Sequence, residues 1–423
     1  MKTMDTIFNA TTMMIRGLLT GLITGVLITL FTLAIHFAWE LNTSYRFLIF
    51  LIPLASLFTL YLYKKYGESY KKTTDIAISE INTLSQRESK SILKGTAKEI
   101  CPQMGILAFF TTFLTHLSGA SGGKEGAGVQ IGFASASIAQ SIEEWVTEKI
   151  FKRTPKYGNY YLMCGAGAAF GALFNAPIAG VLFATQLASP KMSRYDAIFP
   201  CLLATYSSVF ISQKLGAHIL SIPEVTELPF TMENLVIVLV FASLVGLYSR
   251  FFCYFIYAIK NYLKSKFHSH YHRVLCMSIL LTILSFVFYF VLGTFKYNGL
   301  GPILLTEMIN GTANNYDHLI KFLFVLLTFT SGFMGGEVVP LFIIGSGFGL
   351  MFANIFALPV SAFATLGAIG MLAGGTNLPY VCFALGIELF GYHEISLLFL
   401  AANISFITSG KNGIYHKQMP AMD

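Results

Sequence analysis

Two glutamates lie in glycine-rich segments that separate apolar runs of this sequence. Glu125 stands within residues 122–132, Gly-Gly-Lys-Glu-Gly-Ala-Gly-Val-Gln-Ile-Gly, and Glu337 within residues 335–340, Gly-Gly-Glu-Val-Val-Pro. Each segment is expected to open a helix, where glycines let the backbone approach a ligand and unpaired N–H groups carry positive partial charge. The two segments therefore predict anion-binding sites at helix N-termini.

A carboxylate at such a position can occupy the anion site while it is charged, and it can vacate the site when it is protonated. We expect Glu125 to gate the site and to carry a proton, because ionisable residues at membrane depth are costly to keep. The alternative is that Glu125 only caps its helix, which contributes about 1 kcal/mol. Glu337 brings a second carboxylate, and two buried carboxylates beside one anion offer a route to coupling proton and anion movement. Its alternatives are a cap or a dimer-interface contact.

The elements that position these residues are predicted to be membrane helices. Of the 423 residues, 55% are apolar and 12% charged, against roughly 25% charged in an average soluble protein. This composition excludes an ordinary soluble enzyme and suffices for on the order of eleven membrane crossings. The apolar runs lack the alternation of barrel strands. The net charge of +7 comes mainly from loops, which predicts topogenic and lipid-facing roles rather than nucleic-acid binding.

The apolar runs have very unequal lengths. The conventional ones are residues 17–39, 47–63, 201–215, 235–259 and 274–292. The others are short or interrupted by Gly, Pro or Asn: residues 102–117, 129–142, 160–174, 177–187, 319–333, 341–358, 362–372, 379–390 and 395–407. Transporters use short, broken helices to build a site at the membrane midplane. The charged residues 64–100 are expected to form a cytoplasmic loop, with Ile76, Ile78 and Ile81 packed on the protein.

An internal repeat relates the two short-helix regions. Ser-Gly-x-x-Gly-Gly at residues 118–123 leads to Ile-Gly at 131–132, and the same pattern at 331–336 leads to Ile-Gly at 344–345. Gly-Ala and then Asn-x-Pro follow in both, at 165–177 and 367–379. We predict one transmembrane domain over residues 1–423, with two halves of inverted topology at about 17–215 and 235–415 and a shared central site. The alternative is that glycine-rich membrane helices merely look alike.

Several of these motifs resemble the CLC family of chloride channels and transporters. Gly-Lys-Glu-Gly with Val-Gln-Ile-Gly at residues 123–132 resembles that family's Gly-Arg-Glu-Gly-Pro-x-Val-Gln-Ile-Gly, and Phe-Asn-Ala-Pro-Ile-Ala-Gly-Val-Leu-Phe at 174–183 resembles its following helix. Gly-Gly-Glu-x-x-Pro, in place of Gly-x-Phe-x-Pro, and the Gly-Ile-Tyr segment at 413–415 resemble the family's fluoride/proton antiporter branch. The chloride branch's Gly-Ser-Gly-Ile-Pro is missing, and residues 73–76 take the corresponding place.

The resemblance implies an all-α CLC-type fold and a homodimer with one anion pathway per subunit. Glu125 would match the gating glutamate and Glu337 the second glutamate of the fluoride branch. The Tyr415 hydroxyl would line the inner side of the anion site, and Thr74 would stand where that branch usually has Met or Asn. Together with the helix N-termini, this gives candidate anion-binding residues Thr74, Gly123, Lys124, Gly126, Val338, Val339 and Tyr415.

The predicted function is therefore proton-coupled anion antiport that exports fluoride from a bacterium across its plasma membrane. The alternatives are a chloride/proton exchanger or a passive chloride channel of the same fold, because Val339 stands where fluoride-selective relatives usually have a hydroxyl residue. The family's inner proton-relay glutamate is missing from residues 184–187, which leaves Glu337 as the candidate for proton exit. An intramembrane enzyme is a competing class without a convincing nucleophile or metal site. We predict no cofactor and no C-terminal regulatory domain.

Overall fold

The computed structural model describes residues 2–66, 74–89, 100–149, 160–189, 194–217, 222–223, 225–226, 228–392, 395–411 and 413–419. These residues form α-helices and two short 3-10 helices, and none of them belongs to a β-strand. In chain order the first half comprises α1 (Lys2–Ser44), η1 (Arg46–Leu51), α2 (Ile52–Tyr66), α3 (Thr74–Ser89), α4 (Pro102–Leu117), α5 (Glu125–Lys149), α6 (Tyr160–Phe174), α7 (Pro177–Gln186), η2 (Tyr195–Ala197) and α8 (Ile198–Lys214). The second half comprises α9 (Met232–Lys266), α10 (His270–Leu292), α11 (Pro302–Ile309), α12 (Asp317–Thr330), α13 (Val338–Phe356), α14 (Val360–Thr376), α15 (Pro379–Phe390) and α16 (Ile395–Ser409).

The predicted apolar runs all become helices, and three of them, α4, α6 and α15, have the predicted bounds. Two helices, α3 and α11, are not predicted. Helix α3 lies in the segment expected to be a charged loop, and its Ile78 and Ile81 are buried as expected, whereas Ile76 is half-buried. Most of the lysines of that expected cytoplasmic loop lie outside the described residues.

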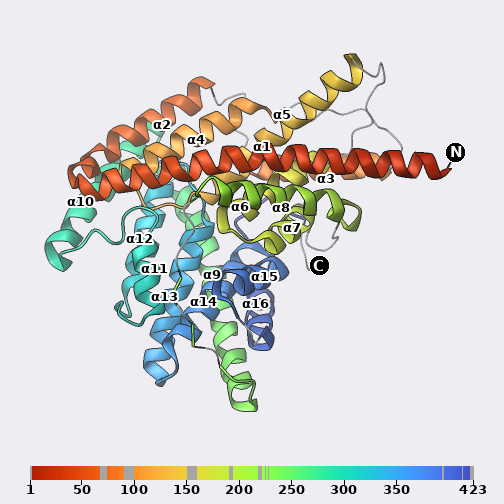
Figure 1. Ribbon diagram of the computed structural model, residues 1–423. Coiled ribbons are helices and arrows are strands. Elements are labelled where there is room, and N and C mark those ends of the chain that lie inside the picture. The colour runs from red at the N-terminus through yellow and green to blue at the C-terminus, as the bar shows by residue number, and fades with distance from the viewer. Residues whose placement is uncertain are drawn as a thin grey trace.

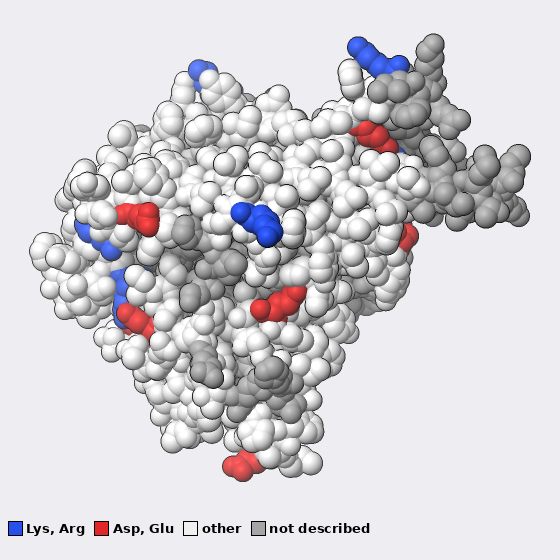
Figure 2. Space-filling model, viewed as in Figure 1, with Lys and Arg blue, Asp and Glu red and all other residues white. Residues whose placement is uncertain are grey.

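Among the described residues, six helices are long and apolar enough to cross a membrane: Thr11–Ser44, Arg46–Tyr66, Tyr195–Lys214, Met232–Lys266, His270–Leu292 and Val338–Phe356. Shorter apolar helices pack between them. Figure 2 shows one face of the molecule, on which charged side chains are few and scattered among uncharged ones. Both observations fit a multi-pass membrane protein.

The first helix organises the first half of the fold. Figure 1 shows α1 lying across the molecule, and it packs on α4, α5, α6 and α8. In the second half α9 and α14 pack together and both contact α16, while α13 lies along α14. The helix pairs α5–α6 and α13–α14 touch through glycines: a Cβ added at Gly132 would collide with the Gly165 carbonyl, and one at Gly345 with the Gly367 carbonyl. Small residues of this kind let helix backbones approach closely.

The two segments that are related by the internal repeat adopt the same backbone conformations at matching residues. Gly119 and Gly332 have φ of 81° and 80°, and Asn175 and Asn377 have φ of 55° and 58°. A positive φ is uncommon for residues other than glycine, and Asn tolerates it best. Each Asn follows the end of a helix and precedes the next Pro-initiated helix, so it turns the chain from one helix into the next.

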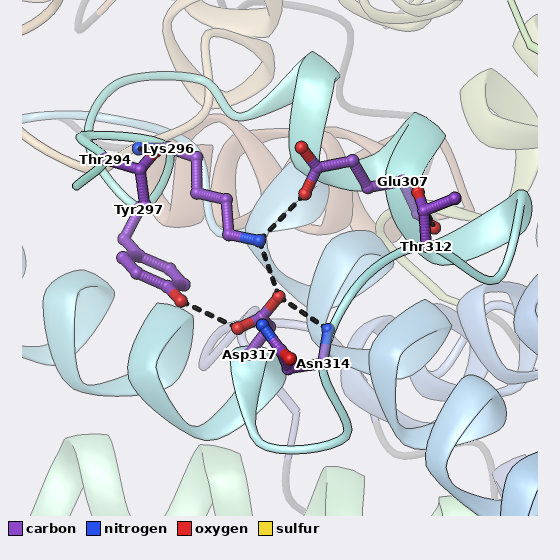
Figure 3. A network of polar contacts seen from close by, with 7 residues as sticks. All are labelled: Thr294, Lys296, Tyr297, Glu307, Thr312, Asn314 and Asp317. Carbon is purple, nitrogen blue, oxygen red and sulfur yellow. Dashed lines mark hydrogen bonds and ion pairs between the residues drawn. The ribbon is translucent and has the colours of Figure 1, made fainter. Parts of the chain in front are cut away.

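A polar network ties the segment between α10 and α11 to the start of α12 (Figure 3). Lys296 Nζ lies 2.8 Å from Glu307 Oε2 and 2.8 Å from Asp317 Oδ2. The Tyr297 hydroxyl donates to Asp317 Oδ1 at 2.7 Å, and the Asn314 backbone N–H donates to Asp317 Oδ2 at 2.9 Å. Asp317 is fully buried, so these three donors replace the water that its carboxylate loses on folding.

Candidate functional site

The two glycine-rich segments lie side by side and are bonded to each other. Gly123 donates its N–H to the Gly336 carbonyl at 2.9 Å, and Gly336 donates its N–H to the Gly123 carbonyl at 2.7 Å. Helix α5 begins at Glu125 and α13 at Val338, immediately after this bridge. The N-termini of the two helices therefore meet at one point, as the repeat predicts.

Glu125 places its carboxylate between the two helix starts. The side chain interacts with the backbone N–H groups of Lys124, of Glu125 itself and of Val339. Glu125 is only 2% exposed, and its Oε2 has no hydrogen-bond partner among the described residues. The negative charge thus faces the positive ends of both helices, which is also the environment that a bound anion would need.

The bridge leaves no room for a side chain at Gly336. A Cβ there would lie 2.7 Å from the Gly126 nitrogen and 3.2 Å from Glu125 Oε2. We therefore expect Gly336→Ala to displace the helix starts and to lower anion flux between about tenfold and a hundredfold in liposomes. Gly122→Ala is the matched control, because its nearest neighbour would be 3.8 Å away. Equal flux in both variants would contradict a tight packing requirement at Gly336.

Glu337 is less buried than Glu125, which contradicts the expectation of two buried carboxylates. It occupies the position before α13, makes no side-chain capping bond, and its side chain is 21% exposed. Its Oε1 instead lies 3.3 Å from Lys260 Nζ, at the end of α9. The capping alternative for Glu337 is therefore not supported. Lys260 is not among the site residues predicted from the sequence. In the sequence it is one of several lysines near the end of an apolar run, and nothing distinguishes it from the others.

A cavity of about 490 Å³ opens next to these helix starts. It brings together five of the predicted site residues, Thr74, Gly126, Glu337, Val338 and Tyr415. They come from α3, α5, the start of α13 and the segment after α16. Tyr415 lies within electrostatic range of the carboxylates of Glu337, Asp75 and Glu125. The cavity lining does not include Glu125, Gly123, Lys124 or Val339. Gly123 forms the bridge, and the Lys124 and Val339 N–H groups face Glu125.

The charged lining of this cavity is mainly basic. Lys260, Lys264 and Arg273 line it, together with Asp75 and Glu337. A cleft lined by an excess of one sign of charge raises the local concentration of the opposite ion. The lining has one more basic than acidic side chain, which is compatible with an anion on the side of the helix starts on which Thr74 and Tyr415 lie.

Two further polar residues lie within apolar helices, His116 in α4 and Glu388 in α15. His116 is fully buried, and neither of its ring nitrogens has a hydrogen-bond partner among the described residues. Glu388 accepts hydrogen bonds from the backbone N–H groups of Ile178 at 2.8 Å and Ala179 at 2.9 Å. It therefore caps the start of α7 from α15.

Residues 56–410 match the voltage gated chloride channel family, and the chain belongs to that family. The fold is accordingly a CLC-type, all-α membrane fold, and the family is one of channels and transporters. The chain is 28% identical to a chloride/fluoride channel protein of Pseudomonas syringae, over 95% of this chain and 84% of the relative. It is 24% identical to the H(+)/Cl(-) exchange transporter ClcA of Klebsiella pneumoniae, over 65% of this chain and 59% of that protein.

The solved structures give the same picture of the fold. A CLC-type fluoride/proton antiporter superposes with a TM-score of 0.83 and 26% identity, covering 97% of this chain and 98% of the other. A slow cyanobacterial Cl-/H+ antiporter superposes with a TM-score of 0.72 and 19% identity, covering 94% of each chain. At 19% identity, the similarity to the cyanobacterial antiporter supports the fold and not a shared function.

Proposed function

We propose that this protein is a proton-coupled anion antiporter that exports fluoride. The observation that carries the proposal is the Glu125 carboxylate held between the N-termini of α5 and α13. A group that fills an anion site as a carboxylate and empties it as a neutral acid links proton binding to anion movement. The choice of fluoride is supported by the similarity to a CLC-type fluoride/proton antiporter along nearly the full length of both chains.

In this proposal protonated Glu125 leaves the helix starts, and the anion takes its place against free backbone N–H groups in the first turns of α5 and α13. Gly126, Val338 and Val339 belong to those turns, and Lys124 adds a positive charge beside them. Gly123 is assigned a structural role instead, because its N–H is donated to Gly336. Glu337 exchanges the proton on the cavity side, while the Thr74 and Tyr415 hydroxyls face the anion from the cavity.

The assembly is also part of the proposal. We infer two repeats of inverted topology, at about 17–215 and 235–415, whose equivalent glycines meet in the Gly123–Gly336 bridge. As the family resemblance implies, the protein would work as a homodimer surrounded by lipid in a bacterial plasma membrane, with one anion pathway in each subunit.

The test is to reconstitute the full chain in liposomes and to record fluoride, chloride and proton fluxes together. Uphill fluoride movement driven by an imposed proton gradient, with much slower chloride movement, is the expected result. Equal coupling of chloride would make the protein a chloride/proton exchanger. Flux of either anion without proton movement would make it a channel. The absence of a hydroxyl at Val339 is the feature that favours chloride.

The Tyr415 hydroxyl gives a second prediction. Tyr415→Phe removes a donor that faces the cavity, and hydrogen bonds to charged partners contribute about 1.5–3 kcal/mol. We therefore expect the fluoride concentration at half-maximal flux to rise at least about tenfold. Tyr380→Phe is the control, because Tyr380 lies exposed on α15 and outside the cavity lining. An unchanged fluoride dependence in Tyr415→Phe would remove Tyr415 from the site.

A further inference from the structure

Lys260 both pairs with the Glu337 carboxylate and lines the cavity proposed to take up the anion. Its Nζ lies 3.3 Å from Glu337 Oε1, and both side chains line the cavity of about 490 Å³. The ammonium group also lies 5.0 Å from the centre of the Phe329 ring, whose face attracts cations. Its position is therefore fixed on two sides, while the cavity side is open to a mobile anion.

The other charged and titratable groups around Glu337 do not replace Lys260. Cys253 lies on α9 about two turns before Lys260 and within electrostatic range of Glu337. His416 lines a small cavity together with Glu337. Tyr415 lies within electrostatic range of both Glu337 and Glu125. Across the cavity, Asp75 Oδ1 accepts a hydrogen bond from the Lys417 backbone N–H at 3.2 Å. Lys264 and Arg273 line the cavity but have no ion pair among the described residues.

The small cavity gives the pair access to a proton carrier. Its volume is about 30 Å³, and its lining includes Lys260, Glu337 and the exposed His416. That space is enough to hold a water molecule. Glu337 and His416 also line the larger cavity, so a proton can reach the Glu337 carboxylate from either space.

We propose that Lys260 switches the anion affinity of the cavity according to the protonation of Glu337. When Glu337 is charged, it neutralises Lys260. When Glu337 takes up a proton, the ion pair is lost and the same ammonium group is released to attract an anion. By linkage, proton binding at Glu337 and anion binding in the cavity then favour each other equally. This inference rests on the proposed function and names the residue that would couple its two ions on the cavity side.

The experiment measures fluoride binding by titration calorimetry to the full chain in detergent, at several pH values, with Glu125→Gln in every variant. That background keeps the central carboxylate from titrating. With Lys260 present, acidification is expected to tighten fluoride binding roughly threefold to tenfold, the usual range for one partly exposed charge. Adding Glu337→Gln should give the tight affinity at every pH. Adding Lys260→Met should weaken binding at every pH and leave only the smaller pH dependence that repulsion between the charged Glu337 carboxylate and the anion produces.

Lys264→Met is the matched control, because Lys264 lines the same cavity one turn further along α9. It should weaken binding at every pH and leave the pH dependence intact. Lys260→Arg, which keeps the charge, should restore the pH dependence and guards against misfolding of Lys260→Met. The inference is overturned if Lys260→Met keeps the full pH dependence seen with Lys260 present, or if Glu337→Gln leaves binding weak. Loss of proton-driven fluoride flux in wild-type liposomes would instead overturn the proposed function, since the binding measurement does not depend on transport.

Discussion

Replacing Glu125 with Gln is expected to abolish proton-driven fluoride transport. The amide cannot exchange a proton, but its oxygen can still accept from the backbone N–H groups of Lys124 and Val339 that the carboxylate faces. The fold should therefore persist while coupling fails. A positioned proton-transfer group commonly contributes roughly 10²–10⁴-fold, so coupled flux should fall at least about a hundredfold. Simultaneous recording of fluoride and proton flux in liposomes measures it.

Glu388→Gln is the matched control for this change. Glu388 is also a carboxylate at a helix start, bonded to the Ile178 and Ala179 N–H groups, but it lies outside the cavity lining. We expect it to lower stability by about 1 kcal/mol and to leave the ratio of fluoride to proton flux unchanged. If Glu125→Gln kept the wild-type ratio, Glu125 would be only a cap.

Asp317→Ala is expected to destabilise the folded protein by about 3 kcal/mol. Asp317 is fully buried, and its loss leaves Lys296, which is 14% exposed, with Glu307 as its remaining ion-pair partner in the network of Figure 3. The Tyr297 hydroxyl and the Asn314 N–H lose their acceptor as well. Removing one partner of a buried pair is costly because the other charge stays buried. Denaturant unfolding in detergent micelles measures the change.

The comparison variant is Glu307→Gln. Glu307 is 32% exposed, so its ion pair with Lys296 is partly screened by solvent and should contribute less than about 1 kcal/mol. Equal losses in the two variants would show that burial of Asp317 does not decide the strength of the network. Fluoride flux in the Glu307 variant should stay near that of the wild type.

Most of the fold could be predicted because membrane helices are recognisable in a sequence as long apolar runs. The two missed helices lack that signal for different reasons. Helix α3 lies in a charged segment and buries only a narrow face, which includes Ala77 and Ile78. Helix α11 covers only Pro302–Ile309 and is too short to stand out as a separate apolar run.

The site was predictable where the repeat makes it symmetrical. The matching glycine motifs place Gly123 beside Gly336, and this is the contact that joins the two helix starts. The environments of the two glutamates could not be predicted, because they depend on packing between distant segments. Lys260 is separated from Glu337 by 77 residues and approaches it only through the fold. The nitrogens of His116, which have no hydrogen-bond partner within the described part of the chain, likewise depend on its neighbours in space and not on its place in the sequence.

The Gly123–Gly336 bridge limits which parts of the protein are free to move. Many transporters expose their site to each side in turn by rocking one repeat against the other. Here two backbone hydrogen bonds join the repeats at the site itself, and a rocking motion that separated them would break both. If the proposed function holds, we therefore expect rotation of the Glu125 side chain, rather than separation of the two helix starts, to open the path. Spectroscopic probes placed on α5 and α13 should keep a constant separation while ions pass between them.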